Sequence, residues 1–305
     1  MKIELLYPDL TGLYGEFGNI AYLTKSVPDV DVVETNLDCK PRFLCGEDID
    51  LVYMSAMSES SQKLIVEELL PYRDEIAISI EKGQFFFLTG NALEIFGSHI
   101  HDNDEESLDC LNIFPVHAER DLLQRYSALY VGKYSLKNVS TDNNSAINTG
   151  NPANNSSEIH FTEAPAVMPD TVSRTGAVAP LWNSINACNE IDIVGQKSQF
   201  TRGYYDKASV NARGLLPICD EVSPLFKTTR GPAFNNHTSG EGLRYRNFMA
   251  TYLLGPILVM NPLFLRALCN EIGIGDITPA FEETAMEAYR TRLKEYNDPN
   301  ISMNI

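Results

Sequence analysis

The sequence predicts an α/β fold built on a mainly parallel sheet with helices on both faces. Short β-like runs alternate with amphipathic stretches over the first half of the chain, which is typical of parallel βα units. The run Gln84–Leu88 is almost continuously apolar, as expected of a strand that helices cover on both sides. The 305 residues, of which 44% are hydrophobic, supply ample material for a core in a single domain spanning residues 1–305.

The expected elements of the first half follow the recurrence of apolar residues. Helical spacing across Gln62–Glu81 predicts a helix that Pro71 divides. Thr89-Gly90-Asn91 is expected to turn into a short helix, with Gly97 at the position after its end. In order, we expect strand 3–7, a helix containing 20–25, strand 50–54, the divided helix 62–81, strand 84–88 and helix 92–96.

A polar segment separates the two halves. Seven asparagines fall between Asn138 and Asn155, among Ser, Thr, Gly and Pro. This composition buries little apolar surface, so residues 137–163 are expected to form a mobile loop or insertion. Beyond it, we expect strands 191–194, 252–254 and 257–259, a helix from Asn261-Pro262 to about 271, and a final helix 279–296.

The charge balance excludes several classes of function. Lys and Arg total 24 and Asp and Glu total 41, giving a net charge of −17. A binder of nucleic acid or of an anionic membrane needs a basic face, so neither partner is expected. No stretch approaches the ~20 apolar residues of a membrane span, and the start is too short and acidic for a signal peptide, so a cytoplasmic location is expected. The six cysteines form no C-x-x-C pair, so we expect reduced thiols and no metal site.

Three ordered motifs stand out along the chain. The first runs from Leu6-Tyr7-Pro8-Asp9-Leu10 through Tyr14-Gly15-Glu16-Phe17-Gly18-Asn19, the second is 109–116, and the third joins Glu241–Asn247 to Thr251–Pro256 and Asn261-Pro262. With the strand 50–54 and the segment 85–97, they resemble class I glutamine amidotransferases. The resemblance is closer to the cobyric acid synthase type, and nearest to the glutaminase subunits of lipid II isoglutaminyl synthases. It spans residues 3 to about 270 outside the polar segment, and it implies a flavodoxin-like three-layer fold.

The resemblance also implies a particular chemistry. In the family, a cysteine on a strand-to-helix elbow attacks glutamine, and a histidine on a later strand removes the thiol proton. A glycine-rich loop supplies backbone N–H groups to the oxyanion, and the ammonia passes to a synthetase partner. The reaction needs no cofactor.

This chain departs from the family pattern at each of those places. Aligned on Gly97, the nucleophile position holds Gly90, and the base position holds Leu254. The former oxyanion loop reads Ser55-Ala56-Met57-Ser58 in place of glycines and a glutamine. A fourth departure is the loop Gly195–Arg202, where the family has a different polar set. Four separate losses predict a chain that is no longer a glutaminase.

Six polar residues remain as candidates for the former cleft. They are Thr89, Asn91, Glu94, Lys197, Gln199 and Arg202. Four of them have a plainer structural interpretation: Thr89 as a helix cap, Glu94 as a first-turn carboxylate, and Lys197 and Arg202, with Arg244, as surface ion pairs. His237 is expected in a solvated loop, and Cys110 and Cys188 are expected to be inert.

Three functions remain open on the sequence. The first is a catalytically inactive binding or regulatory subunit for a synthetase, such as a Mur-ligase-like protein. The second is an enzyme with changed chemistry that uses Thr89, Glu94 or Lys197. The third is a sensor of a small molecule or peptide, which would bind where Gly90 leaves room in the former thioester pocket.

Overall fold

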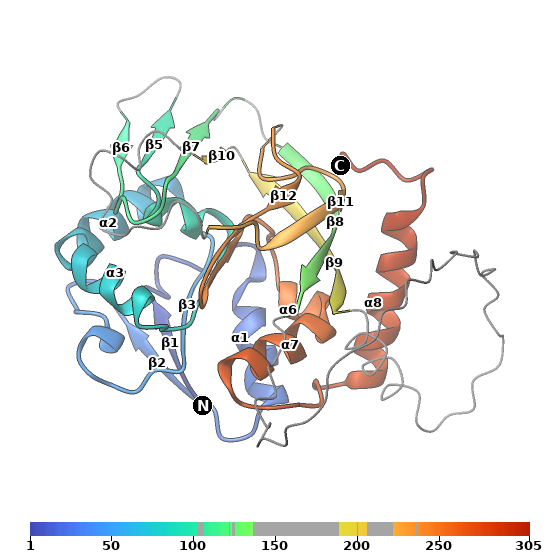
Figure 1. Ribbon diagram of the computed structural model, residues 1–305, viewed down its shortest axis with the longest axis horizontal. Helices are drawn as coiled ribbons and strands as arrows, with labels where there is room; N and C mark the ends of the chain where they lie inside the picture. Colours follow the sequence, from blue (N-terminus) through green and yellow to red (C-terminus); the bar gives the residue numbers. More distant parts are fainter. Residues whose placement is uncertain are drawn as a thin grey trace, which may run out of the picture. The chain divides into compact units, whose positions relative to one another are not determined.

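The computed structural model describes residues 1–102, 107–121, 123, 126–136, 189–199, 201–205, 222–235 and 237–305 (Figure 1). The asparagine-rich segment 137–163 lies outside these described residues, so its expected mobility stays a prediction. Within the described ranges, the fold is mixed α/β, as the sequence predicts.

A six-stranded sheet forms the centre of the fold. Its strands are β1 (Lys2–Leu6), β2 (Asp31–Thr35), β3 (Leu51–Met54), β4 (Phe86–Thr89), β13 (Leu243–Tyr245) and β14 (Phe248–Thr251). Their order is β13-β14-β4-β3-β1-β2, and every neighbouring pair except β13–β14 is parallel. The strands expected at 3–7, 50–54 and 84–88 are confirmed. Strand β2 was not expected, because it lies at the sheet edge and only its last residue, Thr35, is buried.

Helices pack on both faces of this sheet. The helical segments of the described residues are η1 (Leu13–Gly15), α1 (Phe17–Ser26), η2 (Arg42–Leu44), α2 (Glu59–Leu69), η3 (Leu70–Tyr72), α3 (Arg73–Glu81), η4 (Gly90–Phe96), α6 (Ile257–Met260), α7 (Pro262–Ile272) and α8 (Glu282–Asn297). Pro71 lies in η3, between α2 and α3, so the predicted division of helix 62–81 is confirmed. In the ribbon, α2 and α3 lie across the sheet from α1, α6 and α7 (Figure 1).

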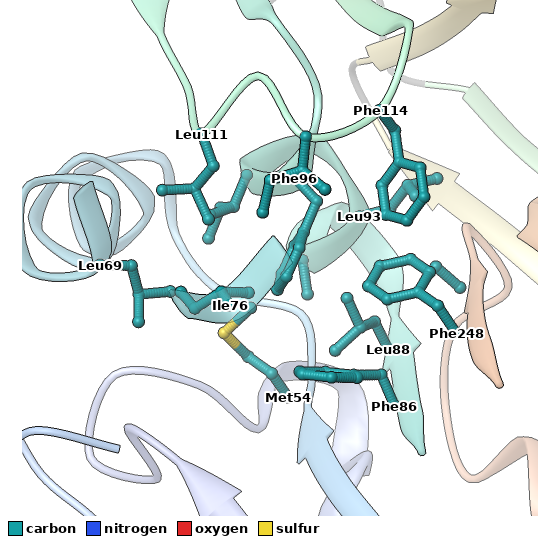
Figure 2. Close-up of a cluster of buried hydrophobic side chains, with 14 of the residues drawn as sticks. Met54, Leu69, Ile76, Phe86, Leu88, Leu93, Phe96, Leu111, Phe114 and Phe248 are labelled. Atoms are coloured by element: carbon teal, nitrogen blue, oxygen red, sulfur yellow. The ribbon is translucent and has the colours of Figure 1, made fainter. Parts of the chain in front are cut away.

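Successive side chains of the central strands point alternately to the two faces of the six-stranded sheet, and both faces are covered by helices. Met54, Phe86 and Leu88 join Leu69 and Ile76 of α2 and α3 in one buried apolar cluster (Figure 2). This alternation follows from the two-residue period of a strand, since odd and even positions point to opposite faces. On the other face, the ring of Phe87 contacts Phe264 of α7, with their centroids 6.0 Å apart.

Two smaller four-stranded sheets flank the centre. Of their strands, the sequence predicted only 191–194, which lies inside Glu190–Gln199. One consists of β5 (His99–Asp102), β6 (Leu108–Asp109), β7 (Val116–Arg120) and β10 (Thr201–Tyr205), in the order β10-β7-β5-β6. The other consists of β8 (Tyr126–Ser135), β9 (Glu190–Gln199), β11 (Phe226–Arg230) and β12 (Gly240–Glu241), in the order β12-β11-β8-β9. Because most of their pairings are antiparallel, a mainly parallel sheet describes the central sheet alone.

Strands β8 and β9 form a long antiparallel ribbon. Their ten-residue register begins at Tyr126 opposite Gln199 and ends at Ser135 opposite Glu190. The chain therefore leaves this ribbon after Ser135 and returns to it at the adjacent position, Glu190.

Three local expectations were wrong. Residues 257–259 form helix α6 rather than a strand, directly after Gly255 and Pro256. Residues 252–254 lie beyond the end of β14, and Leu254 makes an isolated bridge with Gln196. Gly97 has a φ of −75° instead of the left-handed value expected after a helix end. A Cβ there would lie 2.5 Å from the Val116 carbonyl oxygen, so close approach explains the glycine.

The last two helices are confirmed. Helix α7 begins at Pro262, where proline fits the first turn, and ends before Gly273 in the left-handed conformation. Within the described residues, no helix combines the length and apolarity needed to cross a membrane.

The aromatic rings around Phe86 in the buried apolar cluster should contribute strongly to the free energy of unfolding. The Phe86 ring contacts Phe43, Phe96 and Phe248, with centroids 5.3 to 6.1 Å apart. We expect Phe86→Ala to lower the free energy of unfolding by about 3–5 kcal/mol, because it leaves a cavity among these rings. Urea unfolding measures the loss. The matched control is Ile78→Ala in α3, where the side chain is 52% exposed and the change should stay within about 1 kcal/mol. Equal losses in both variants would contradict this account of the core.

Candidate functional site

The candidate site lies where the parallel strands β1, β3, β4 and β14 end. The carboxyl ends of parallel strands meet at one edge of a sheet, which is where such folds place their functional loops. The structure brings three of the predicted positions together here. A Cβ added to Gly90 would lie 2.5 Å from Ala56 Cβ and 2.9 Å from Leu254 Cδ2. Ala56 and Leu254 are themselves buried.

Both the backbone conformation at position 90 and the packing around it favour glycine. Its φ is +63°, in the left-handed region that side chains disfavour. Because Ala56 and Leu254 already fill the space that a side chain would need, Gly90 opens no room for a ligand. The premise of the sensor hypothesis is therefore wrong at this position.

A buried carboxyl group, that of Glu16, organises the strand ends. Its Oε2 accepts hydrogen bonds from the Ala56 backbone N–H at 2.5 Å and from the Thr89 hydroxyl at 3.0 Å. The Tyr53 hydroxyl lies 3.2 Å from the Thr89 hydroxyl and donates to the Glu16 carbonyl at 3.1 Å. Thr89 makes no capping hydrogen bond to η4, so its expected role as a helix cap is wrong. Its hydroxyl belongs to the Glu16 network.

The rest of the loop Ser55–Ser58 is also bonded internally. The Met57 backbone N–H donates to Asn91 Oδ1 at 3.0 Å, and Asn91 Nδ2 donates to the Met57 carbonyl at 3.0 Å. Ser58 begins helix α2, where its Oγ accepts from the Ser61 backbone N–H at 3.1 Å. Ser55 is fully buried. The backbone N–H groups of Ala56 and Met57 thus already have acceptors from the chain itself.

Glu94 belongs to a second buried group. It is 3% exposed, and its Oε2 lies 3.2 Å from Arg120 Nη2 and accepts from Gln62 Nε2 at 2.9 Å. Arg120 also donates to the Gln62 side-chain oxygen. Glu94 lies in the second turn of η4, so its interpretation as a first-turn carboxylate is wrong. A buried pair of this kind holds its partners in place more than it adds stability.

Lys197 is also buried, and its Nζ lies 5.8 Å from the centre of the Tyr252 ring. Its Nζ lies 3.3 Å from Glu241 Oε1 and donates to the Ala233 carbonyl at 2.9 Å. Burial lowers the pKa of Lys197, and the Glu241 carboxylate opposes that effect. The expectation of a surface ion pair is therefore wrong for Lys197. Burial raises the pKa of Tyr252, and the neighbouring Glu94 carboxylate raises it further.

The remaining predicted residues lie elsewhere. Arg202 is on β10 opposite Glu119, in one of the smaller sheets. Gln199 is the last residue of β9, where its backbone pairs with Tyr126 of β8. Arg244 donates to Glu271 and to the Tyr134 hydroxyl, each at 2.6 Å, as expected of an ion pair. His237 lies in an exposed turn.

Burial raises the pKa of the Cys110 thiol, which agrees with an inert cysteine. Cys188 lies outside the described residues. Within the described ranges, no three His, Cys, Asp or Glu side chains are grouped as ligands of one metal ion.

Sequence reasoning missed the residues that organise the site. Glu16 and Glu241 lie inside the quoted motifs, but their types and positions in the sequence do not indicate their roles. Both are fully buried, which is rare for a carboxylate and marks a structural or functional centre once burial is known. Gln62 and Arg120 carried no such signal, because a single glutamine or arginine in an amphipathic pattern is ordinarily exposed.

No protein-family model matches the chain. A curated relative, the lipid II isoglutaminyl synthase (glutamine-hydrolyzing) subunit GatD of Streptococcus pneumoniae (strain ATCC BAA-255 / R6), is 30% identical over 112 residues. The match covers 35% of this chain and 41% of that protein, so the chain spans less than half the length of the relative it matches.

Two solved structures resemble the chain at low similarity. One is a crystal structure of a glutamine amidotransferase, with 12% identity, a TM-score of 0.43 and coverage of 89% of this chain and 98% of that one. The other is a glutamine amidotransferase from Thermotoga maritima, with 7% identity, a TM-score of 0.37 and coverage of 98% of each chain.

The titration of Glu16 should be visible in the stability of the protein. Burial raises its pKa to about 8, whereas an unfolded glutamate titrates near ~4.3. The stability linked to its proton is therefore fully present below about pH 4.3 and is lost as the pH rises through about 8. We expect the free energy of unfolding to fall by up to about 1.4 kcal/mol per pH unit between these values.

Urea unfolding across this pH range measures the slope. Glu16→Gln keeps the shape of the side chain but cannot ionise, so it should flatten this part of the profile. An unchanged slope in Glu16→Gln would show that other groups set the pH dependence.

Proposed function

We propose that this chain is a catalytically inactive glutamine amidotransferase-like protein of the cobyric acid synthase type, with a flavodoxin-like three-layer fold. Two findings support the proposal. The first motif follows β1, and residues 251–256 of the third follow β14, so both lie at the carboxyl ends of parallel strands, where such folds hold their sites. In addition, 112 residues are 30% identical to a subunit whose name includes glutamine hydrolysis.

The observation that carries the inactivity is the Glu16 carboxyl group. In the family chemistry, the loop after the third strand must offer N–H groups to a developing oxyanion, and such donors act only if they are free to meet that charge. Here the Ala56 N–H already donates to Glu16, and the Met57 N–H already donates to Asn91. The side chains of this protein thus occupy the donors that an oxyanion would need.

The other two elements are missing for independent reasons. Gly90 has no side chain to attack a carbonyl, and Leu254 cannot accept a proton. Ala56 also blocks the space into which a side chain at position 90 would project. Restoring one element would therefore leave the others absent.

A binding or regulatory role toward a synthetase follows as the function we favour. The curated relative is named as a subunit of a synthase, and an inactive homologue can keep a partner-binding surface after its chemistry is lost. We propose a synthetase partner, such as a Mur-ligase-like protein, in the cytoplasm. The net charge of −17 argues against nucleic acid or an anionic membrane as the partner, and the proposed role needs no cofactor.

The alternative functions have less support. A sensor would need a cavity at Gly90, and that space is filled. An enzyme with changed chemistry would need Thr89, Glu94 or Lys197 exposed to a substrate, yet all three are buried and bonded within the chain.

We expect the purified protein to release no ammonia from glutamine, alone or with a candidate synthetase. Loss of the nucleophile from a triad-type enzyme costs on the order of a million-fold in turnover. A coupled assay of ammonia release measures the rate, with an active glutaminase as the positive control. Turnover that a thiol-directed glutamine analogue abolishes would show that the nucleophile lies elsewhere. Turnover that resists the analogue would favour changed chemistry.

The contact between Ala56 and Gly90 can be tested by a double-mutant cycle. Gly90→Ala should lose about 1–2 kcal/mol to the left-handed backbone, and a further amount because its Cβ would overlap Ala56. Ala56→Gly should recover the second loss, so the two changes together should be less destabilising than their sum. Urea unfolding of the four proteins gives the coupling. Strict additivity would contradict the packing described here.

Adding a nucleophile and a base should not by itself produce glutaminase activity. Gly90→Cys with Leu254→His supplies a nucleophile and a base but leaves Ala56 in place and Glu16 on the loop. We expect this pair of changes to remain inactive in the ammonia assay.

A further inference from the structure

A cavity of about 410 Å³ lies at the amino-terminal edge of the central sheet. Two of the residues that line it, Asp50 and Phe85, directly precede strands β3 and β4. Ala56 and Gly90 of the candidate site follow the same two strands, so the cavity and that site lie at opposite edges of one sheet. A volume of this size falls within the range of pockets that hold small molecules.

Part of the cavity wall is apolar. Phe43, Ile49, Phe85 and Ile272 line it; Phe43 and Ile49 are buried, and Phe85 is half-buried. The Phe43 ring contacts the Phe86 ring with centroids 5.3 Å apart, so this wall is continuous with the core. Among the described residues, no aromatic ring pairs with Phe85. A ligand ring can therefore pack beside it, as aromatic rings prefer to do.

Hydrogen bonds fix the shape of the wall. Gln84 Nε2 donates to the Ile49 carbonyl at 2.8 Å, and the Gln84 backbone N–H donates to the Ser79 carbonyl at 3.1 Å. Asn247 Nδ2 donates to the carbonyl of Gly83 at 2.7 Å. These bonds join the loop before β3, the end of α3 and the start of β4, so the cavity is already formed without a ligand.

Two exposed side chains of opposite charge, Asp50 and Lys82, line the same cavity. Within the part of the chain that the structure describes, neither forms an ion pair with the other or with a third residue. The Lys2 backbone N–H donates to Asp50 Oδ2 at 2.7 Å, which orients the carboxylate toward its second oxygen as the remaining acceptor. Ser79 also lines the cavity and lies three residues before Lys82, so its hydroxyl is on the same side of α3.

We propose that this cavity binds a free α-amino acid with an aromatic side chain. The ligand ammonium would pair with Asp50, its carboxylate would pair with Lys82 and Ser79, and its ring would pack on the apolar wall at Phe85. Only a zwitterion satisfies both charges at once, since a ligand with a single charge leaves one of them without a partner. The four-carbon stem of lysine lets its ammonium group follow the ligand carboxylate. The proposal does not depend on the proposed function, because the cavity lies away from the strand-end site.

Calorimetric titration of the full chain with L-phenylalanine tests the proposal. We expect one saturable site with a Kd of about 1 mM or below, as for a small ligand in an open pocket. Phenylacetate and phenethylamine each lack one charge, and each should bind about 2–5-fold more weakly than phenylalanine. N-acetylphenylalanine amide keeps the ring and lacks both charges, so it should bind more weakly still. Absence of saturable phenylalanine binding would overturn the proposal, as would equal affinity for the amide.

Charge variants assign each end of the ligand. Lys82→Gln should weaken phenylalanine binding about 2–5-fold and leave phenethylamine binding unchanged, because that amine has no carboxylate. Asp50→Asn should weaken phenylalanine binding to a similar extent and leave phenylacetate binding unchanged; the new amide oxygen can still accept from the Lys2 N–H. Lys63→Gln and Asp48→Asn are the matched controls, since both residues are exposed and neither lines the cavity.

A space-filling variant locates the ligand. Ser79→Tyr adds a ring from α3 into the cavity and should abolish phenylalanine binding, while circular dichroism and urea unfolding check that the chain still folds. Unchanged phenylalanine affinity in folded Ser79→Tyr would place the ligand elsewhere and overturn the proposal. Equal losses in Lys82→Gln and Lys63→Gln would likewise overturn it, because the effect would then come from net charge.

Discussion

The candidate site depends on one buried carboxyl group. Glu16 follows the first strand of the sheet in sequence, Ala56 follows β3, and Thr89 ends β4, so the Oε2 atom of Glu16 joins three strand ends through two hydrogen bonds. A carboxyl group without partners would be costly at this depth, and the loop supplies one with the Ala56 N–H. The bond that stabilises this edge of the sheet is also the bond on which the proposed inactivity rests, because it occupies the Ala56 N–H.

Other buried polar side chains tie the remaining elements to the same edge. Asn19 of α1 donates to the Tyr53 hydroxyl at 2.9 Å and accepts from the Leu258 backbone N–H at 2.8 Å, so it connects β3 to α6. Asn261 makes a reciprocal pair with the backbone of Val194, at 2.8 and 2.7 Å, and so connects α7 to β9. Such fully bonded polar groups specify one arrangement of helices against strands, which apolar packing alone specifies less sharply.

The sequence predicts the central sheet better than its surroundings, for physical reasons. Strands β3 and β4 are buried on both faces and read as apolar runs, and Pro71 marks a break that any helix must show. Strand β5 reads His-Ile-His-Asp, and its pairing of Ile100 with Ala118 on a separate strand leaves no local signal. The run Ile257–Met260 is rich in strand-forming residues, yet the preceding Pro256 and tertiary packing place it in a helix. In the site, the proposed replacement of a nucleophile by Gly90 and of a base by Leu254 can be read from the chain. The occupation of the loop by Glu16 cannot, because it depends on where one carboxyl oxygen meets one N–H.

The β8–β9 ribbon has a consequence for how this protein tolerates change in length. Its last register pair, Ser135 with Glu190, brings the two ends of the intervening 136–189 segment to neighbouring positions on the sheet. The entropy of closing a loop rises only with the logarithm of its length, at about 0.6 kcal/mol for each doubling. Residues inserted between the two arms of the ribbon therefore add little closing entropy, so long as both arms remain. This is the position at which a homologue could gain or lose an insertion, or at which an inserted reporter domain would leave the central sheet and its strand-end site intact.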